Sequence, residues 1–153
     1  YEIPEGLKEG CKNQIGNREK SIEHYANKIK ANTSANGYRL PMAVEWEYAA
    51  RGGENYKYAG SNDLDEVGWY DKNSGGKTHG VAQKKANGYG LYDMSGNVWE
   101  WCFDLCSDDT SFRASRGGGW HYEAYYCSVS DLEWYYPSKR SCKFGVRLFR
   151  TVL

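Results

Sequence analysis

Cysteine and histidine are the residue types in this sequence that could do metal or thiol chemistry. The five cysteines are Cys11, Cys102, Cys106, Cys127 and Cys142, and the three histidines lie far apart at positions 24, 79 and 121. Structural zinc sites use pairs of such ligands at short spacings, and the sequence has no CxxC pair. An odd number of cysteines leaves at least one thiol unpaired within the chain. The sequence does not decide whether the other cysteines form disulfides or which of them would pair.

A dense group of aromatic residues lies between Arg116 and Arg140, where seven of the seventeen residues from Trp120 to Tyr136 are aromatic. Tyr and Trp combine a rigid contact area with a polar tip, and for this reason they dominate antibody paratopes and binding hot spots. The run 133–136 lacks the alternation of a strand with one buried face. We expect most of these aromatics to be exposed for binding, and Trp120 to pack inside. The alternative for Tyr122, Tyr125 and Tyr126 is a place in the core.

Composition limits the class of protein. The 153 residues are enough for one domain, and 20 basic side chains balance 20 acidic ones. The balance argues against a nucleic-acid or anionic-lipid surface, and no apolar run is long enough to predict a membrane span. The first ten residues do not have the pattern of a signal peptide. With 18 glycines and a mean hydropathy of −0.83, the sequence predicts a loop-rich fold with an aromatic core.

Hydrophobic periodicity predicts two helices followed by short strands. The first helix is expected from Arg18 to Ala31, and the second after Pro41 through AVEWEYAAR, with Trp46, Ala49 and Ala50 on one face. Gly52 and Gly53 should end the second helix. Long loops should follow, then strands at 91–94, 98–102, 115–120 and 127–130 and a last one in KFGVRLFRTVL. This order predicts an α+β domain with two helices beside a small antiparallel sheet.

Four stretches resemble the formylglycine-generating-enzyme, or sulfatase-modifying-factor, family. They are GYRLPMAVEWEYAARGG (37–53), NGYGLYDMSGNVWEWC (87–102), SRGGGWHYEAYYC (115–127) and FGVRLFR (144–150). The resemblance covers residues 37–150 and implies that family's variant of the C-type lectin fold, in one domain over 1–153. Trp46, Tyr48, Trp99 and Trp101 are expected to be core aromatics.

The catalytic cysteine pair of that family is broken here. In the bacterial enzymes, the first cysteine falls four positions after the second Gly of RGG, and the other follows five positions later. Those positions are Tyr122 and Cys127, and Gly119 replaces the usual Ser. A phenol cannot replace a thiolate in copper binding or thiol chemistry. We therefore predict no catalysis and no cofactor, and expect Cys127 to be a buried core thiol.

The segment 113–147 also resembles the variable proteins of diversity-generating retroelements, the Treponema variable proteins among them. In that family, error-prone reverse transcription changes template adenines, so that Asn codons become codons for many other residues. A fixed frame separates the varied positions. This sequence supplies frame residues Arg113, Arg116, Gly117, Gly118, Trp120, Ala124, Cys127, Val129, Ser130, Pro137, Ser138, Arg140, Gly145 and Arg147.

Fourteen residues between the frame positions are the predicted ligand-binding residues, which we call the filler positions. Asn occurs ten times in the first 97 residues and never in the last 56, which agrees with diversification of Asn codons. The filler positions are His121, Tyr122, Glu123, Tyr125, Tyr126, Asp131, Glu133, Trp134, Tyr135, Tyr136, Lys139, Ser141, Cys142 and Lys143.

The resemblance implies a non-catalytic, ligand-binding variable protein, with a formylglycine-generating oxidase or an inactive structural relative as alternatives. It implies a protein or cell-surface ligand, and a secreted or surface location with a lipid anchor on the full-length protein. We expect a monomer. The enzyme family often holds calcium near the GNVWEW turn, where Asn97 and Glu100 have suitable oxygens. A side-chain hydrogen bond that caps the loop is the alternative, and no metal is predicted.

Overall fold

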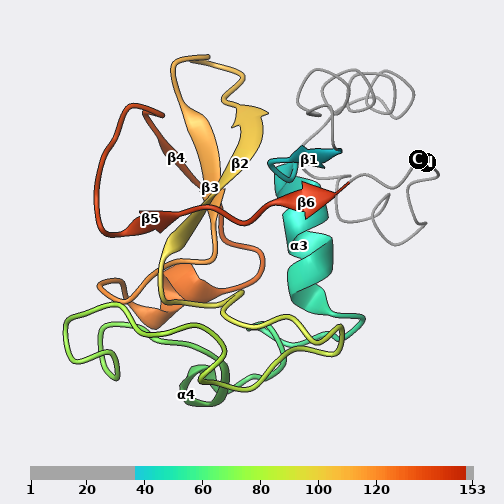
Figure 1. Ribbon diagram of the computed structural model, residues 1–153, viewed down its shortest axis with the longest axis vertical. Coiled ribbons are helices and arrows are strands. Elements are labelled where there is room, and N and C mark those ends of the chain that lie inside the picture. Colours follow the sequence, from blue (N-terminus) through green and yellow to red (C-terminus); the bar gives the residue numbers. More distant parts are fainter. Residues whose placement is uncertain (1–36, 151–153) are drawn as a thin grey trace. The chain divides into compact units, whose positions relative to one another are not determined.

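A computed structural model describes residues 37–150 (Figure 1), and the predicted helix from Arg18 to Ala31 lies outside them. The described residues belong to two compact units. In the first, strand β1 (Tyr38–Arg39) pairs antiparallel with β6 (Phe149–Arg150). The second, Pro41–Arg147, contains the other elements and all fourteen filler positions. The α+β class and the family's fold are confirmed, while the single domain over the whole chain stays a prediction.

Helix α3 (Ala43–Arg51) forms where the sequence predicts it, with Trp46, Ala49 and Ala50 on its buried face. At its first residue, the backbone N–H of Ala43 donates to a carboxylate oxygen of Asp104 at 2.6 Å. Such a bond satisfies one of the N–H groups that a helix leaves without an internal partner.

The other end of α3 is closed by Gly52 and Asn87. Gly52 takes the left-handed φ of 60° that glycine favours at helix ends. The Asn87 amide donates to the last-turn carbonyls of Ala49 and Ala50 at 2.7 and 2.9 Å. A Cβ at position 52 would lie 2.8 Å from the Asn87 side chain, so this packing also requires glycine.

A four-stranded sheet is formed by strands from the second half of this unit (Figure 1). Its order is β4 (Glu133–Tyr135), β3 (Arg113–Arg116), β2 (Trp99–Leu105) and β5 (Phe144–Gly145). The pairs β4–β3 and β3–β2 are antiparallel, as predicted, but β5 runs parallel to β2. Helix α3 packs against β2 and β3.

Several predicted strands are wrong or shorter than expected. Residues 91–94 form a loop, because Asp93 has a φ of 57°, which ends an extended strand. Residues 127–130 form no strand, because Cys127 is the last residue of a 3-10 helix, η2 (Ala124–Cys127). The predicted strand 115–120 ends at Arg116, and the C-terminal strand is interrupted between β5 and β6.

Four elements were not predicted from the sequence: strand β1, the one-turn helix α4 (Leu64–Val67), the 3-10 helix η2 and strand β4. All three residues of β4 are half-buried, so the pattern carries no alternation of buried and exposed positions. Only the pairing with β3, which places Trp134 opposite Ala114, makes this segment a strand.

The core of the larger unit is aromatic, as predicted. Trp46 and Trp99 are fully buried, whereas Trp101 is half-buried. Tyr48 corrects the prediction: it is 37% exposed, and its hydroxyl accepts a hydrogen bond from that of Tyr89 at 3.2 Å. A polar tip that reaches solvent at the helix surface explains this position. Within residues 37–150, no helix is long and apolar enough to cross a membrane.

Candidate functional site

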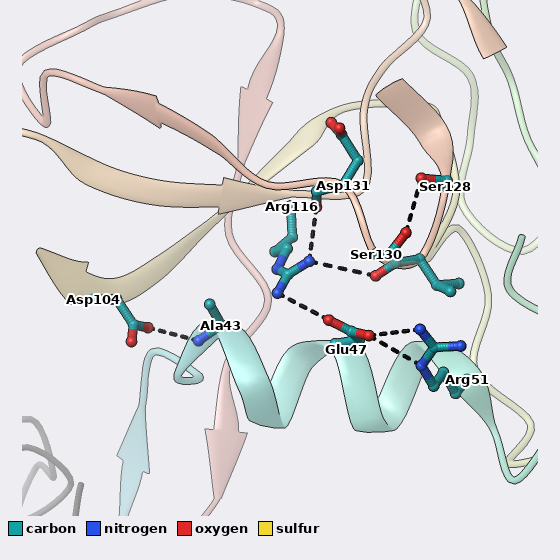
Figure 2. Close-up of polar contacts among 9 residues, drawn as sticks. Ala43, Glu47, Arg51, Asp104, Arg116, Ser128, Ser130 and Asp131 are labelled. Atoms are coloured by element: carbon teal, nitrogen blue, oxygen red, sulfur yellow. Dashed lines mark hydrogen bonds and ion pairs between the residues drawn. The ribbon is translucent and has the colours of Figure 1, made fainter. Parts of the chain in front are cut away.

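The frame residue Arg116 anchors the aromatic stretch to the rest of the fold, as Figure 2 shows. Its guanidinium is buried at the end of β3 and donates to the Glu47 carboxylate of α3 at 3.1 Å. It also donates to the backbone carbonyls of Asp131 at 2.8 Å and Val129 at 3.5 Å. One buried charge therefore holds the helix and the chain that leads into β4.

Two glycines after Arg116 allow the chain to turn against Cys127. Gly117 and Gly118 have φ values of 94° and 70°, which residues other than glycine rarely adopt. A Cβ on Gly118 would lie 2.6 Å from the Tyr126 carbonyl oxygen and 2.7 Å from the Cys127 sulfur. The RGG motif thus has a packing role here: it brings β3 and η2 into contact.

Cys127 is fully buried, which confirms the predicted core thiol. It packs in a cluster with Tyr58, Leu64, Val67 and Tyr70. Burial raises the pKa of the Cys127 thiol to about 12, so that the sulfur stays protonated and unreactive at neutral pH. In the described part of the chain, Cys102, Cys106, Cys127 and Cys142 are all free thiols.

Thiol reactivity tests this placement. Cys142 is exposed and Cys127 is buried, so iodoacetamide at pH 7.5 should alkylate Cys142 at least tenfold faster. Peptide mass spectrometry after timed labelling of the folded protein measures both rates, and labelling in guanidinium should remove the difference. Similar rates in the folded protein would contradict the buried thiol.

An aromatic face surrounds the buried Trp99 ring. Tyr122, Tyr126 and Tyr135 contact this ring edge-on, with centroids at 5.5, 6.4 and 6.1 Å. The favourable edge-to-face geometry adds about 1 kcal/mol to each burial. Burial, followed by a hydrogen bond with Tyr122, raises the pKa of Tyr135. Phe144 of β5 extends the group, with its ring 4.9 Å from that of Tyr135.

The expected exposure of the tyrosines holds for some of them. Tyr125 and Tyr136 are 65% and 53% exposed. Tyr122, Tyr126 and Tyr135 are half-buried instead, because one edge of each ring rests on Trp99. Trp120 is also half-buried, where full packing inside was expected. Tyr122, Tyr126 and Tyr135 therefore pack on Trp99, while the rings of Tyr125 and Tyr136 are open to solvent.

Two lysines lie over the rings of this surface. The Lys139 ammonium is 4.2 Å from the Tyr135 centroid, and that of Lys143 is 5.4 Å from the Tyr122 centroid. A cation over an aromatic face is attracted by the negative charge of the ring. Both long side chains are thereby oriented along the face.

Burial distinguishes some of the frame residues from the filler positions. None of the fourteen filler positions is buried. Seven are exposed, namely His121, Glu123, Tyr125, Tyr136, Lys139, Ser141 and Cys142, and the other seven are intermediate. Five frame residues are buried, namely Arg116, Gly117, Gly118, Cys127 and Val129, and the other nine are exposed or half-buried. Sequence analysis missed Trp99 and Phe144 as the base of the face, although the GNVWEW motif contains Trp99.

Among the carboxyl groups of the filler residues, that of Asp131 has a shifted pKa. Burial, helped by the Glu133 charge and opposed by Arg116, raises the pKa of Asp131 to about 6. The unfolded chain ionises near pH 3.9, about the value for free Asp. The stabilising contribution of the protonated group is therefore complete below about pH 4 and is lost as the pH rises through 6.

Substitution of Asp131 tests that sign. The melting temperature of the wild type minus that of Asp131→Asn should fall between pH 4.5 and pH 7, because only the wild type must ionise a half-buried carboxyl. Differential scanning calorimetry at several pH values measures the two temperatures, and the exposed Asp71→Asn controls for loss of one carboxylate. Parallel curves for wild type and Asp131→Asn would contradict the shift.

Asn97 and Glu100 make hydrogen bonds within the protein, which matches the alternative to a calcium site. The Asn97 amide accepts from the His79 backbone N–H and donates to the His79 carbonyl, at 3.0 and 3.2 Å. Glu100 accepts from the Trp46 indole at 2.7 Å and pairs with Arg147 at 2.8 Å. Both side chains thus connect the loops to the core.

Comparisons with known proteins identify a matching family and several similar proteins. The family model for the sulfatase-modifying factor enzyme 1-like domain matches residues 20–152. The chaperone protein LppX of Paenibacillus barcinonensis is 44% identical over 135 residues, 72% of this chain and 46% of its own. The formylglycine-generating enzyme of Thermomonospora curvata is 44% identical over 89 residues, 48% of this chain and 29% of its own.

A solved structure, Treponema denticola variable protein 1, superimposes with a TM-score of 0.71 and 41% identity. The match covers 74% of this chain and 47% of that one. This chain thus spans about half the length of these relatives or less. A variable protein and an enzyme share this fold, so the fold does not show whether the chain is catalytic. That question depends on the residues of the site.

Proposed function

The chain belongs to the sulfatase-modifying factor enzyme 1-like family, and we propose that it is a non-catalytic variable protein that displays a diversified, ligand-binding surface. One observation carries the proposal: all fourteen filler positions have exposed or half-exposed side chains, while the buried residues of the two sets, Arg116, Gly117, Gly118, Cys127 and Val129, all belong to the frame. Surface substitutions away from special contacts change stability by about 0.5 kcal/mol or less. Such a division lets a diversity-generating retroelement change the surface while the fold persists.

The composition of the face supports binding. Tyrosines give a large contact area at low entropic cost, and Tyr125 and Tyr136 offer theirs to solvent. The inner rings on Trp99 are held before a ligand arrives, which reduces the ordering cost of binding. We propose a protein or cell-surface molecule as the ligand, and a secreted or surface-displayed, lipid-anchored full-length protein, active as a monomer.

The chemistry of the two motif positions argues against the oxidase. Tyr122 stands where the first cysteine of the enzymes lies, and its ring packs against Trp99. Cys127 is buried and protonated, so a metal that needs a thiolate pair finds neither ligand ready. Incubation with copper and a cysteine-containing sulfatase peptide should give no formylglycine product. Turnover of that peptide would support the enzyme instead.

A saturation library at every position from 113 to 147, sorted for protease resistance on yeast, tests the proposal. Most substitutions at the outer filler positions should leave the folded fraction unchanged, whereas Arg116, Gly118 and Cys127 should tolerate few. Tyr122, Tyr126 and Tyr135 should accept other large side chains better than Ala. Equal intolerance at fillers and frame would contradict a diversified surface.

The gene's neighbourhood tests the origin of the diversity. A reverse transcriptase gene and a near-copy of the segment for residues 113–147 should lie close by. Sequencing of many cells should then find differences concentrated at the fourteen filler codons. An invariant segment with no such copy would favour the inactive structural relative.

A further inference from the structure

A loop rich in basic residues connects the two outer strands of the four-stranded sheet. Residues 136–143, which we call the cationic loop, run from the end of β4 to the start of β5 (Figure 1). The loop contains Lys139, Arg140 and Lys143 and no acidic residue. Lys139 and Arg140 are exposed, and Lys143 is half-buried. Short segments rich in Lys and Arg are typical of surfaces that bind polyanions.

Contacts at the base and within the cationic loop hold its shape. Tyr135 ends β4 and Phe144 begins β5, and their rings lie 4.9 Å apart. Inside the loop, the Lys139 N–H donates to the Tyr136 carbonyl at 2.9 Å, and the Phe144 N–H donates to the Ser141 carbonyl at 3.3 Å. A loop that is ordered before binding loses less entropy when a partner arrives.

The two lysine ammonium groups lie over the rings at the base of this loop. The Lys139 ammonium is 4.2 Å from the Tyr135 centroid and 5.4 Å from the Phe144 centroid. The Lys143 ammonium is 5.4 Å from the Tyr122 centroid. A hydrogen bond joins the side chains of Tyr122 and Tyr135, so both lysines rest on one connected group of rings. The rings orient the ammonium groups but carry no net charge that would neutralise them.

The three cations of the loop have no anionic partner. No ion pair within residues 37–150 involves Lys139, Arg140 or Lys143. The acidic filler residues all precede the loop in the chain, and they are Glu123, Asp131 and Glu133. The loop therefore carries three positive charges without a paired negative charge, which favours an anionic ligand.

The spacing of the cations favours a polymer with closely spaced anionic groups. Lys139 and Arg140 are adjacent, and Lys143 follows three positions after Arg140. A sulfated polysaccharide carries anionic groups on most of its sugar units, so that each cation can contact one of them. Sulfate oxygens also accept hydrogen bonds, and the exposed hydroxyls of Ser138 and Ser141 lie in the same loop.

Nucleic acid fits this surface less well. Proteins that bind single strands combine a cationic groove with open aromatic faces on which the bases stack. The rings beneath these cations are engaged instead: Lys139 lies over Tyr135, and Phe144 stacks with Trp101 at a centroid distance of 4.8 Å. The chain also has as many acidic as basic side chains, whereas nucleic-acid-binding domains are usually basic.

We propose that the cationic loop binds a sulfated polysaccharide, with sulfate groups against Lys139, Arg140 and Lys143. The proposal rests on the proposed function, because Lys139 and Lys143 are filler positions of a ligand-binding surface. Arg140 belongs to the frame, so one cation stays when the filler positions change. Diversification that replaces both lysines would therefore remove this specificity.

Isothermal titration calorimetry with a heparin hexasaccharide tests the proposal. The Kd should rise about tenfold or more between about 50 and 200 mM NaCl, because a polyanion releases its counterions when it binds. At low salt, Lys139→Gln with Lys143→Gln should raise the Kd roughly tenfold. Lys139→Arg with Lys143→Arg keeps both charges and should stay near the wild-type value, which separates charge from any change in folding.

The matched control removes two positive charges elsewhere. Lys57 and Lys85 are exposed, and the Lys57 ammonium also lies over a tyrosine ring, 5.1 Å from the Tyr58 centroid. Lys57→Gln with Lys85→Gln should leave the Kd unchanged. Hyaluronan hexasaccharide, hexaglutamate and dodecathymidylate should each bind about tenfold or more weaker than the heparin probe.

Four results would overturn the proposal: no heparin binding, equal weakening by the control pair, unaltered binding in the Lys→Gln pair, or equal affinity for any of the other three polyanions. Failure of heparin binding beside a saturation library that tolerates filler substitutions would show that only the ligand class is wrong. Heparin binding by the cationic loop beside a library that is intolerant at the filler positions would contradict the diversified surface and leave this site in place.

Discussion

Arg116→Met should lower the free energy of unfolding by about 3 kcal/mol, because it removes a buried charge that donates several hydrogen bonds. Its guanidinium is 3% exposed and donates to Glu47 and to the carbonyls of Val129 and Asp131. Methionine fills similar space but leaves these acceptors without their donor. Glu47 keeps its bond to Arg51, which limits the loss.

Urea denaturation followed by tryptophan fluorescence measures this change. Arg140→Met is the matched control, because Arg140 belongs to the same frame but is exposed. Its free energy of unfolding should stay within about 0.5 kcal/mol of the wild type. Equal effects of the two substitutions would show that Arg116 does not anchor the stretch to α3.

Gly118→Ala should destabilise the protein by about 3 kcal/mol, from two causes. Its φ of 70° costs a residue with a side chain about 1 kcal/mol. The added methyl would also lie 2.6 Å from the Tyr126 carbonyl oxygen and 2.7 Å from the Cys127 sulfur, and overpacking of this kind costs about 1–3 kcal/mol.

Gly75→Ala separates these two causes. Gly75 has a similar φ of 63°, but a Cβ there meets nothing within 4 Å. The control should therefore lose about 1 kcal/mol, and the difference between the variants gives the cost of the close approach. Thermal denaturation followed by circular dichroism compares them. If the two variants melt together, β3 and η2 are not in tight contact through Gly118.

The carboxylates of Asp131 and Glu100 differ in burial and in the donors that pair with them. Burial, with the Glu133 charge adding to it, raises the pKa of Asp131, and the Arg116 charge opposes this rise. Glu100, by contrast, is buried with Arg147 and the Trp46 indole as donors. Glu100 therefore has donors for its buried oxygens, whereas Oδ2 of Asp131 has none among the described residues.

Local sequence patterns were sufficient for the helix and the main hairpin. Trp46, Ala49 and Ala50 repeat at helical spacing, and Gly52 can take a left-handed φ, so α3 follows from its own residues. Strand β2 is likewise found near the predicted position. The expected loss of one catalytic cysteine also needs only the residue type at Tyr122.

Other features depend on contacts between residues far apart in the chain. β4 exists because Ala114 of β3 offers a pairing partner, and Leu91–Met94 fails as a strand because Asp93 turns to bond Ala82. Burial of Tyr122, Tyr126 and Tyr135 depends on Trp99, which the sequence places more than twenty residues earlier.

The amino-acid sequence alone determined the family and the absence of one cysteine of the pair, and it predicted the interleaving of frame and filler residues, since these depend on residue types at fixed spacings. Only the tertiary structure decided which aromatic rings rest on Trp99 and which remain free, because a tyrosine's exposure depends on what packs beside it. It also turned Asp93 to accept a hydrogen bond from the Ala82 N–H, which no local pattern could show.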